Sequence, residues 1–171
     1  MRFNSIFMKN QKYKLLAVAT LVALAFFRLI PHPPNFTPIL AISVFAGIKF
    51  KDNLFSYLVP VSAMIVSDAI IGFHNGIIII YLAIVLSAYI SRRFNTINTS
   101  VLGSCILFYL ITNFQVWVMS SSYSKSLIGI LECYTLAIPF LGMTLLSTFL
   151  YSYVLFYGYS FLSKLNTYQK I

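Results

Sequence analysis

The sequence predicts an all-α fold: a polytopic membrane bundle of six transmembrane helices with both termini in the cytoplasm. Sixty per cent of the 171 residues are hydrophobic, only 9% are charged, and the apolar residues fall into six long runs. A water-soluble domain carries about 25% charged residues, so this composition excludes a soluble globular enzyme. It also excludes a disordered chain, which needs low hydrophobicity and high charge.

A helix needs roughly 20 residues to cross about 30 Å of hydrocarbon, and the six apolar runs are candidate spans by this criterion. The first run, residues 15–30, follows a basic start, as in a signal peptide. Arg28 and the prolines after it do not resemble a cleavage site, so we interpret this run as a retained first helix. The other predicted helices cover residues 37–50 (a short one), 54–73, 76–91, 101–119 and 136–162.

The basic residues predict the orientation. The chain has 12 Lys and Arg against three acids. Ten of these 12 lie before the first run, between the second and third, between the fourth and fifth, or after the sixth. Basic loops stay in the cytoplasm, which leaves Arg28 and Lys125 for the outer side. We expect a basic cytoplasmic segment at 1–14, a transmembrane domain at 15–162 and a cytoplasmic tail at 163–171. The basic side then faces anionic lipid rather than nucleic acid.

The segment between the first two helices contains three of the six prolines. Prolines at 31, 33 and 34 stop the first helix, Thr37 suits the N-cap of the next, and Pro38 suits its first turn. A helix over 38–50 is about 20 Å long, shorter than the bilayer core. Either its lysines snorkel at the inner end, or the proline loop dips inward, where it must be buried or line a wet cavity. A tight outer turn without a ligand is the other interpretation.

Asp68 lies about one and a half turns inside the outer end of the third run. A carboxylate inside a membrane is costly, so it needs a partner or a cavity. Arg28 lies at a similar depth on the first run, and an Arg28–Asp68 pair is the simplest solution. Alternatively, either residue contacts a polar substrate. His32 and His74 flank the same region, but their spacing to Asp68 fits no metal motif, and we expect neither a metal nor a cofactor.

Further polar residues lie toward the outer side. Asn113 and Trp117 are four residues apart, hence on one face of the fifth helix. They suit a ligand pocket, a contact with another helix, or the membrane interface. Residues 127–134 follow a helical apolar spacing that predicts a short surface helix, a lid or a plug, with Glu132 near its end. The candidate substrate-binding residues are Arg28, His32, Asn35, Asp68, His74, Asn113, Trp117 and Glu132.

Four stretches carry a resemblance to known proteins. They are RLIPHPPNFTPILAISVFAG (28–47), PVSAMIVSDAIIGFHNG (60–76), FYLITNFQVWV (108–118) and GILECYTLAIPFLGMTLLSTFLYSYVLF (129–156). They resemble an uncharacterised bacterial family of six-helix integral membrane proteins, which implies the bacterial cytoplasmic (inner) membrane. The size and helix plan are also similar to the S components of energy-coupling-factor transporters. Those proteins capture vitamins and dock on a scaffold membrane subunit with two ATPases, through small residues that Ala19 and Ala23 resemble.

Two functions follow as hypotheses. The first is the substrate-binding subunit of a transporter for a small, vitamin-like molecule, with an outward-facing site. The chain has no phosphate-binding loop, so energy would come from partner subunits or a gradient. The second is a structural or accessory subunit of a larger membrane complex, without a ligand. An enzyme is not expected, because no nucleophile, base and orienting group converge.

Overall fold

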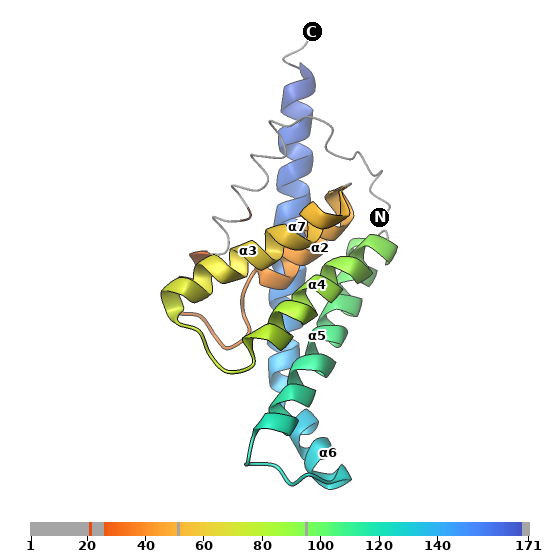
Figure 1. Ribbon diagram of the computed structural model, residues 1–171. Coiled ribbons are helices and arrows are strands. Elements are labelled where there is room, and N and C mark those ends of the chain that lie inside the picture. Colours follow the sequence, from red (N-terminus) through yellow and green to blue (C-terminus); the bar gives the residue numbers. More distant parts are fainter. Residues whose placement is uncertain (1–20, 22–25, 51, 95, 169–171) are drawn as a thin grey trace.

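The computed structural model describes residues 21, 26–50, 52–94 and 96–168, with side chains up to residue 161. Over this part of the chain the fold is all-helical, which confirms the predicted class (Figure 1). A short 3₁₀ helix, η1 (Phe26–Leu29), comes first. The α helices are α2 (Ile39–Lys49), α3 (Asn53–Ile71), α4 (Ile77–Phe94), α5 (Ile97–Met119), α6 (Leu127–Leu136) and α7 (Ile138–Tyr168).

Four of these helices, α3, α4, α5 and α7, are long and apolar enough to cross a membrane, as in a multi-pass membrane protein. The other two, α2 and α6, have 11 and 10 residues. Most of the predicted first span, residues 15–30, lies outside the described residues, and its described end forms η1. The structure therefore supports four of the six predicted spans by length and places the predicted second span in a short helix.

The start of α2 differs by one residue from the prediction. Pro38 occupies the N-cap position with φ −79°, and its carbonyl accepts the amide of Ile42 at 2.9 Å. The ring of Pro38 fixes φ near −65°, a value that the cap tolerates as well as the first turn does, so Thr37 is not needed as the cap. At the start of α5, Thr96 is the N-cap, and its side chain accepts the amide of Thr99. That cap extends the predicted fifth helix toward its N-terminus.

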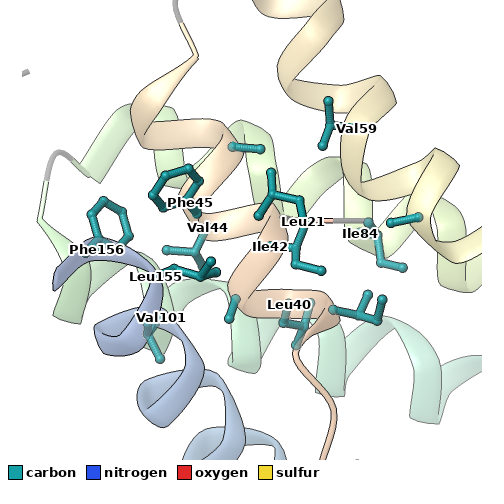
Figure 2. Packing of buried hydrophobic residues seen from close by; sticks show 14 of the residues in the cluster. Leu21, Leu40, Ile42, Val44, Phe45, Val59, Ile84, Val101, Leu155 and Phe156 are labelled. Carbon is teal, nitrogen blue, oxygen red and sulfur yellow. The ribbon is translucent and has the colours of Figure 1, made fainter. Parts of the chain in front are cut away.

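The centre of the bundle is α2, which packs against α3, α4, α5 and α7. All but one of its residues are buried, so it is surrounded on every side rather than amphipathic. Figure 2 shows Leu40, Ile42 and Phe45 of α2 among side chains of the neighbouring helices. Gly47 allows α2 to approach α4 closely, because an added Cβ would collide with the carbonyl oxygen of Ala88.

The two ends of the bundle have different chemistry. At one end, which we call the basic end, Lys49 closes α2 and Arg92 and Arg93 close α4. At the opposite end, which we call the cavity end, α3 turns into α4 through residues 72–76. Gly72 (φ 110°) and Gly76 (φ 89°) in this turn have positive φ angles that favour glycine. The cavity end also carries the proline loop, residues 30–38.

Beyond the cavity end, α6 lies across the ends of α5 and α7 (Figure 1). It confirms the predicted short helix. Gly129 and Cys133 face inward, whereas Leu127, Ile128 and Leu131 are 82%, 78% and 67% exposed. A helix with an outward apolar face suits the edge of a bilayer or a partner surface.

Candidate functional site

A buried ion pair joins η1 to α3 at the cavity end. The Arg28 guanidinium donates from Nη1 to Asp68 Oδ1 at 2.7 Å, and the Asp68 side chain is only 1% exposed. The same nitrogen also contacts Ser67 Oγ at 2.6 Å and Met64 Sδ at 3.0 Å. This confirms the predicted Arg28–Asp68 pair and gives the intramembrane carboxylate the partner that it requires.

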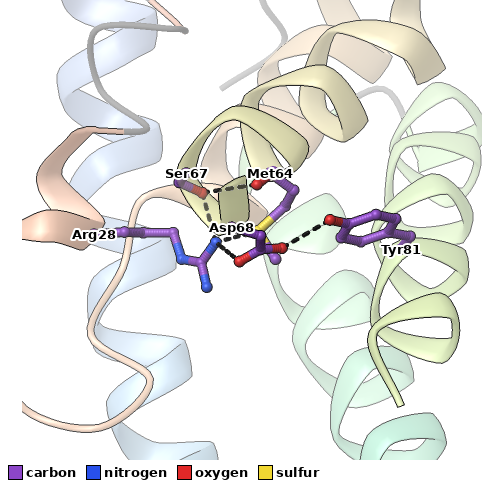
Figure 3. Close-up of polar contacts among 5 residues, drawn as sticks. All are labelled: Arg28, Met64, Ser67, Asp68 and Tyr81. Carbon is purple, nitrogen blue, oxygen red and sulfur yellow. Dashed lines mark hydrogen bonds and ion pairs between the residues drawn. The ribbon is translucent and has the colours of Figure 1, made fainter. Parts of the chain in front are cut away.

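Asp68 has a second partner that the sequence did not point to. The hydroxyl of Tyr81, on α4, donates to Asp68 Oδ2 at 2.8 Å, so both carboxylate oxygens accept a hydrogen bond (Figure 3). The sequence spacing could have predicted this contact. Asp68 lies about one helical turn before the tight loop 72–76 and Tyr81 about one helical turn after it, so the antiparallel helices bring the two side chains together. The carboxylate therefore holds η1, α3 and α4 in register.

A cavity of about 360 Å³ opens beside this ion pair. Its lining comes from η1, the proline loop, and helices α2, α3, α4, α5 and α7. The lining combines polar and apolar side chains. The lining residues are Arg28, His32, Asn35, Thr37, Ile39, Leu40, Met64, Ile71, His74, Ile80, Ile84, Phe108, Thr144, Ser147 and Thr148.

The proline loop positions two of the candidate residues. His32 Nδ1 donates to the carbonyl of Pro33 at 2.9 Å, which leaves Nε2 for another partner. Asn35 has φ 62°, a conformation that asparagine tolerates better than most residues. Its carbonyl accepts the hydroxyl of Ser147 at 3.2 Å, and this bond ties the loop to α7. The loop is thus packed on the bundle and lines the cavity.

The snorkelling alternative for the short helix concerns Lys49, which the structure describes, and Lys51, which lies outside the described residues. In the snorkelling alternative, Lys49 would extend from the inner end of α2. Instead Lys49 is 3% exposed, and its ammonium lies 5.5 Å and 5.0 Å from the ring centres of Phe156 and Tyr159.

His74 occupies the turn between α3 and α4. Its Nδ1 donates to the carbonyl of Asn75 at 3.0 Å, the same arrangement as in His32. Both histidines are exposed and line the cavity. The described residues contain no group of three or more His, Cys, Asp or Glu side chains that could hold a metal ion.

α7 contributes a wall of hydroxyl groups that the sequence analysis missed. Thr144, Ser147 and Thr148 line the cavity, and their i, i+3, i+4 spacing on an apolar span was the available signal. Thr144 donates to the carbonyl of Phe140 at 2.8 Å. Thr148 Oγ1 is buried and has no hydrogen-bond partner among the described residues. The sulfur of Cys105, a weak hydrogen-bond acceptor, lies beside this hydroxyl, and the thiol itself donates to the Thr144 carbonyl at 3.8 Å.

Asn113 and Trp117 are not brought to this cavity. α5 reaches the cavity with Phe108, and Trp117 lies nine residues, or about 14 Å, further along the helix. The amide of Asn113 donates to the carbonyl of Tyr109 at 2.8 Å, one turn back. The indole of Trp117 donates to the carbonyl of Ser124 at 3.0 Å. Both side chains are used within α5 and the loop that follows it.

The loop after α5 is fastened by Lys125. Its ammonium donates to the carbonyls of Trp117 and Ser120 and lies 5.5 Å from the centre of the Trp117 ring. Glu132 is exposed on α6, away from the cavity lining. The proposed docking residues Ala19 and Ala23 lie outside the described residues. The structure thus gathers Arg28, His32, Asn35 and His74 around one cavity, with Asp68 directly behind Arg28.

Comparison with known proteins places the chain in a family. Residues 8–171 match a family described as "Family of unknown function (DUF6580)". The chain belongs to this family. Searches among curated proteins and among solved structures found no match. Membership of DUF6580 agrees with the expected uncharacterised family and assigns no activity, so the function is argued from the cavity.

Proposed function

We propose that this DUF6580 protein is the substrate-binding membrane subunit of an uptake transporter for a small, vitamin-like molecule. The observation that carries the proposal is the cavity of about 360 Å³ at the cavity end. Small-molecule sites have volumes of about 300–1,000 Å³ and combine an apolar lining with a few convergent polar groups. Here the polar groups are Arg28, two histidines and the hydroxyls of α7, and the apolar part includes Leu40, Ile84 and Phe108.

The proposal includes an orientation. Lys49, Arg92 and Arg93 lie at the basic end, and the positive-inside rule favours the cytoplasm for that end. The cavity end then faces outward, where an uptake protein meets its substrate. In this proposal the energy comes from partner subunits, such as a scaffold membrane subunit with ATPases, and the chain itself binds rather than catalyses.

A cavity-filling substitution tests the proposal. Ile80 lines the cavity, whereas Ile78, two residues earlier on α4, is 77% exposed. Ile80→Trp places a large ring in the cavity, and Ile78→Trp places the same ring on the outer surface. The full-length protein in lipid nanodiscs is equilibrated with a defined metabolite mixture and washed, and the retained compounds are identified by mass spectrometry.

The expected result is that the unsubstituted protein and Ile78→Trp retain the same compound, up to one per chain, and that Ile80→Trp loses it. Uptake of that compound by cells that express the protein with its native partners should follow the same order. A folded protein that retains nothing from the mixture contradicts the proposal. Equal retention by Ile78→Trp and Ile80→Trp contradicts it as well.

A structural role in a larger membrane complex is the second candidate, and α6 favours it. Leu127, Ile128 and Leu131 form an exposed apolar face. An open apolar groove, lined by Ile79, Phe114 and Val118 among others, reaches α6 at Tyr134. Co-purification of one partner at fixed stoichiometry, abolished by Ile128→Lys, would support this role. Loss of the partner without any retained small molecule would make it the better account.

A further inference from the structure

The guanidinium of Arg28 has hydrogen-bond donors that the ion pair does not use. All three contacts of this group, with Asp68, Ser67 and Met64, involve the single nitrogen Nη1. No described residue accepts a hydrogen bond from Nε or Nη2. In Figure 3 the other terminal nitrogen points away from the Asp68 carboxylate. Nε and Nη2 form one edge of the planar guanidinium, with two parallel donors in the geometry that matches a carboxylate.

The carboxylate of Asp68 cannot serve a cationic ligand in the same way. Its Oδ1 accepts from Arg28 and its Oδ2 accepts from Tyr81, and its side chain is 1% exposed. No acidic residue is among those that line the cavity. An amine in the cavity would therefore meet an arginine and two histidines without a free acceptor carboxylate. The charges around this space favour an anion over a cation.

The rest of the cavity suits a body that is mainly apolar. Away from Arg28, its lining includes Leu40, Ile84 and Phe108, from three different helices. Three buried hydroxyls belong to this lining, those of Thr144, Ser147 and Thr148 on α7, and among the described residues Thr148 Oγ1 has no strong hydrogen-bond partner. A buried hydroxyl without a partner is rare, because leaving it unsatisfied costs stability. A ligand with a polar atom at that point would satisfy it.

We propose that the cavity binds a small monocarboxylate with a largely apolar body, and that its carboxylate accepts two hydrogen bonds from Nε and Nη2 of Arg28. Asp68 and Tyr81 then act as positioning residues that hold the guanidinium with this edge toward the ligand. The hydroxyl of Thr148 contacts a second polar atom of the ligand. This inference rests on the proposed function and names the class of substrate.

Three sets of matched probes separate this class from the others. Each set contains a carboxylic acid, its primary amide and the corresponding amine, built on an aliphatic, a phenyl or an indole body that fits about 360 Å³. The full-length protein in nanodiscs is equilibrated with the probes and, separately, with the metabolite mixture, and the retained compounds are counted by charge class. We expect acids to be retained, with the matching amides at least about tenfold weaker, because charge-assisted hydrogen bonds are the stronger ones.

Two variants locate the carboxylate. The double variant Arg28→Gln/Asp68→Asn removes both charges together, keeps a polar side chain at both positions and leaves no buried ion unpaired. We expect it to fold and to bind the retained acid about tenfold more weakly or worse. The single variant Asp68→Asn keeps Arg28 but removes the carboxylate that positions its guanidinium, so we expect it to bind the acid more weakly than the unsubstituted protein and more tightly than the double variant.

The possible outcomes separate a wrong ligand class from a wrong function. Retention of neutral or cationic compounds in place of acids overturns the carboxylate assignment but leaves the proposed function standing. Equal affinity of the double variant and the unsubstituted protein for the acid also overturns the assignment. Retention of nothing, by a protein whose fold is shown by its unfolding transition, overturns both.

Discussion

The basic end and the cavity end of the bundle each bury a basic side chain, and they compensate its charge differently. At the basic end Arg92 donates to the carbonyl of Phe50 at 2.7 Å and to Ser56 at 3.3 Å. Lys49 lies in the last turn of α2 against two aromatic rings. Arg92 thus satisfies a carbonyl at the end of α2, and Lys49 lies at the helix C-terminus, where the helix dipole favours positive charge.

At the cavity end the cation is compensated by a buried carboxylate. Arg28 pairs with Asp68 and also lines the cavity. The acids differ in the same way. Asp52, near the basic end, is an exposed N-cap that accepts the amide of Phe55 at 3.1 Å, whereas Asp68 joins three elements. The charged side chains of the basic end lie at helix termini, whereas the ion pair of the cavity end lies beside a cavity.

The largest expected effect comes from removing each acid in turn. Asp68→Ala leaves the Arg28 guanidinium without its counter-ion, which should lower the free energy of unfolding by about 3–5 kcal/mol. Asp52→Ala removes only a helix cap and should cost about 1 kcal/mol. Unfolding in SDS and lipid micelles measures both values. Equal losses for the two variants would remove the distinction between the ends.

The close approach of α2 and α4 gives the next effect, nearer the basic end. An alanine at Gly47 would press its Cβ against the Ala88 carbonyl and come within 2.9 Å of Ser91 Cβ. We expect Gly47→Ala to destabilise the protein by about 1–3 kcal/mol through overpacking. Gly142→Ala on α7, where a Cβ meets nothing within 4 Å, is the control and should be neutral or stabilising. A neutral Gly47→Ala would mean that the helices can separate freely.

Tyr81→Phe removes one of the two hydrogen bonds to Asp68 and leaves the ion pair in place. We expect a loss of about 1.5–3 kcal/mol, since the bond is made to a charged group. The matched control is Tyr109→Phe, whose hydroxyl donates to the neutral carbonyl of Tyr134 and should cost about 1 kcal/mol. The same unfolding assay applies. A Tyr81→Phe loss no larger than that of Tyr109→Phe would show that Asp68 does not depend on its second partner.

The smallest effect on stability is expected for Thr148→Val. Its hydroxyl has no partner in the described part of the chain, so its removal should change the free energy of unfolding by no more than about 0.5 kcal/mol. Thr144→Val removes a hydroxyl that bonds the Phe140 carbonyl and should cost about 1 kcal/mol. The affinity for a retained acid should show the opposite order: Thr148→Val should weaken binding more than Thr144→Val does. If Thr148→Val destabilises the protein strongly without any ligand, its hydroxyl has a structural role.

Much of the fold could be predicted from the sequence because hydrophobic runs and helix signals are local. The predicted boundaries at 54–73 and 76–91 compare with Asn53–Ile71 and Ile77–Phe94 in the structure. The Arg28–Asp68 pair was also predictable, since a charged side chain in an apolar span needs a partner at the same depth. Residues 127–134 were recognised by their apolar spacing.

What could not be predicted depends on packing between distant elements. α2 is short and buried on every side, a property that its apolar sequence shares with a spanning helix. The hydroxyls of Thr144 and Thr148 join the cavity because α7 packs against α2 and α5. Trp117 was predicted to bind the ligand because its indole can stack and hydrogen-bond. However, α5 extends beyond the cavity, and the indole donates to the carbonyl of Ser124 in the loop that follows. Sequence spacing shows which residues share a helical face and does not show what lies opposite that face.

An experimental structure of the protein purified from its own membrane, together with the retained acid, tests the central claim most directly. We expect density in the cavity between Arg28 and Ile84, with two oxygen atoms within hydrogen-bond distance of Nε and Nη2 of Arg28. A cavity filled by side chains would contradict the account. So would density for an acyl chain without a polar group at Arg28.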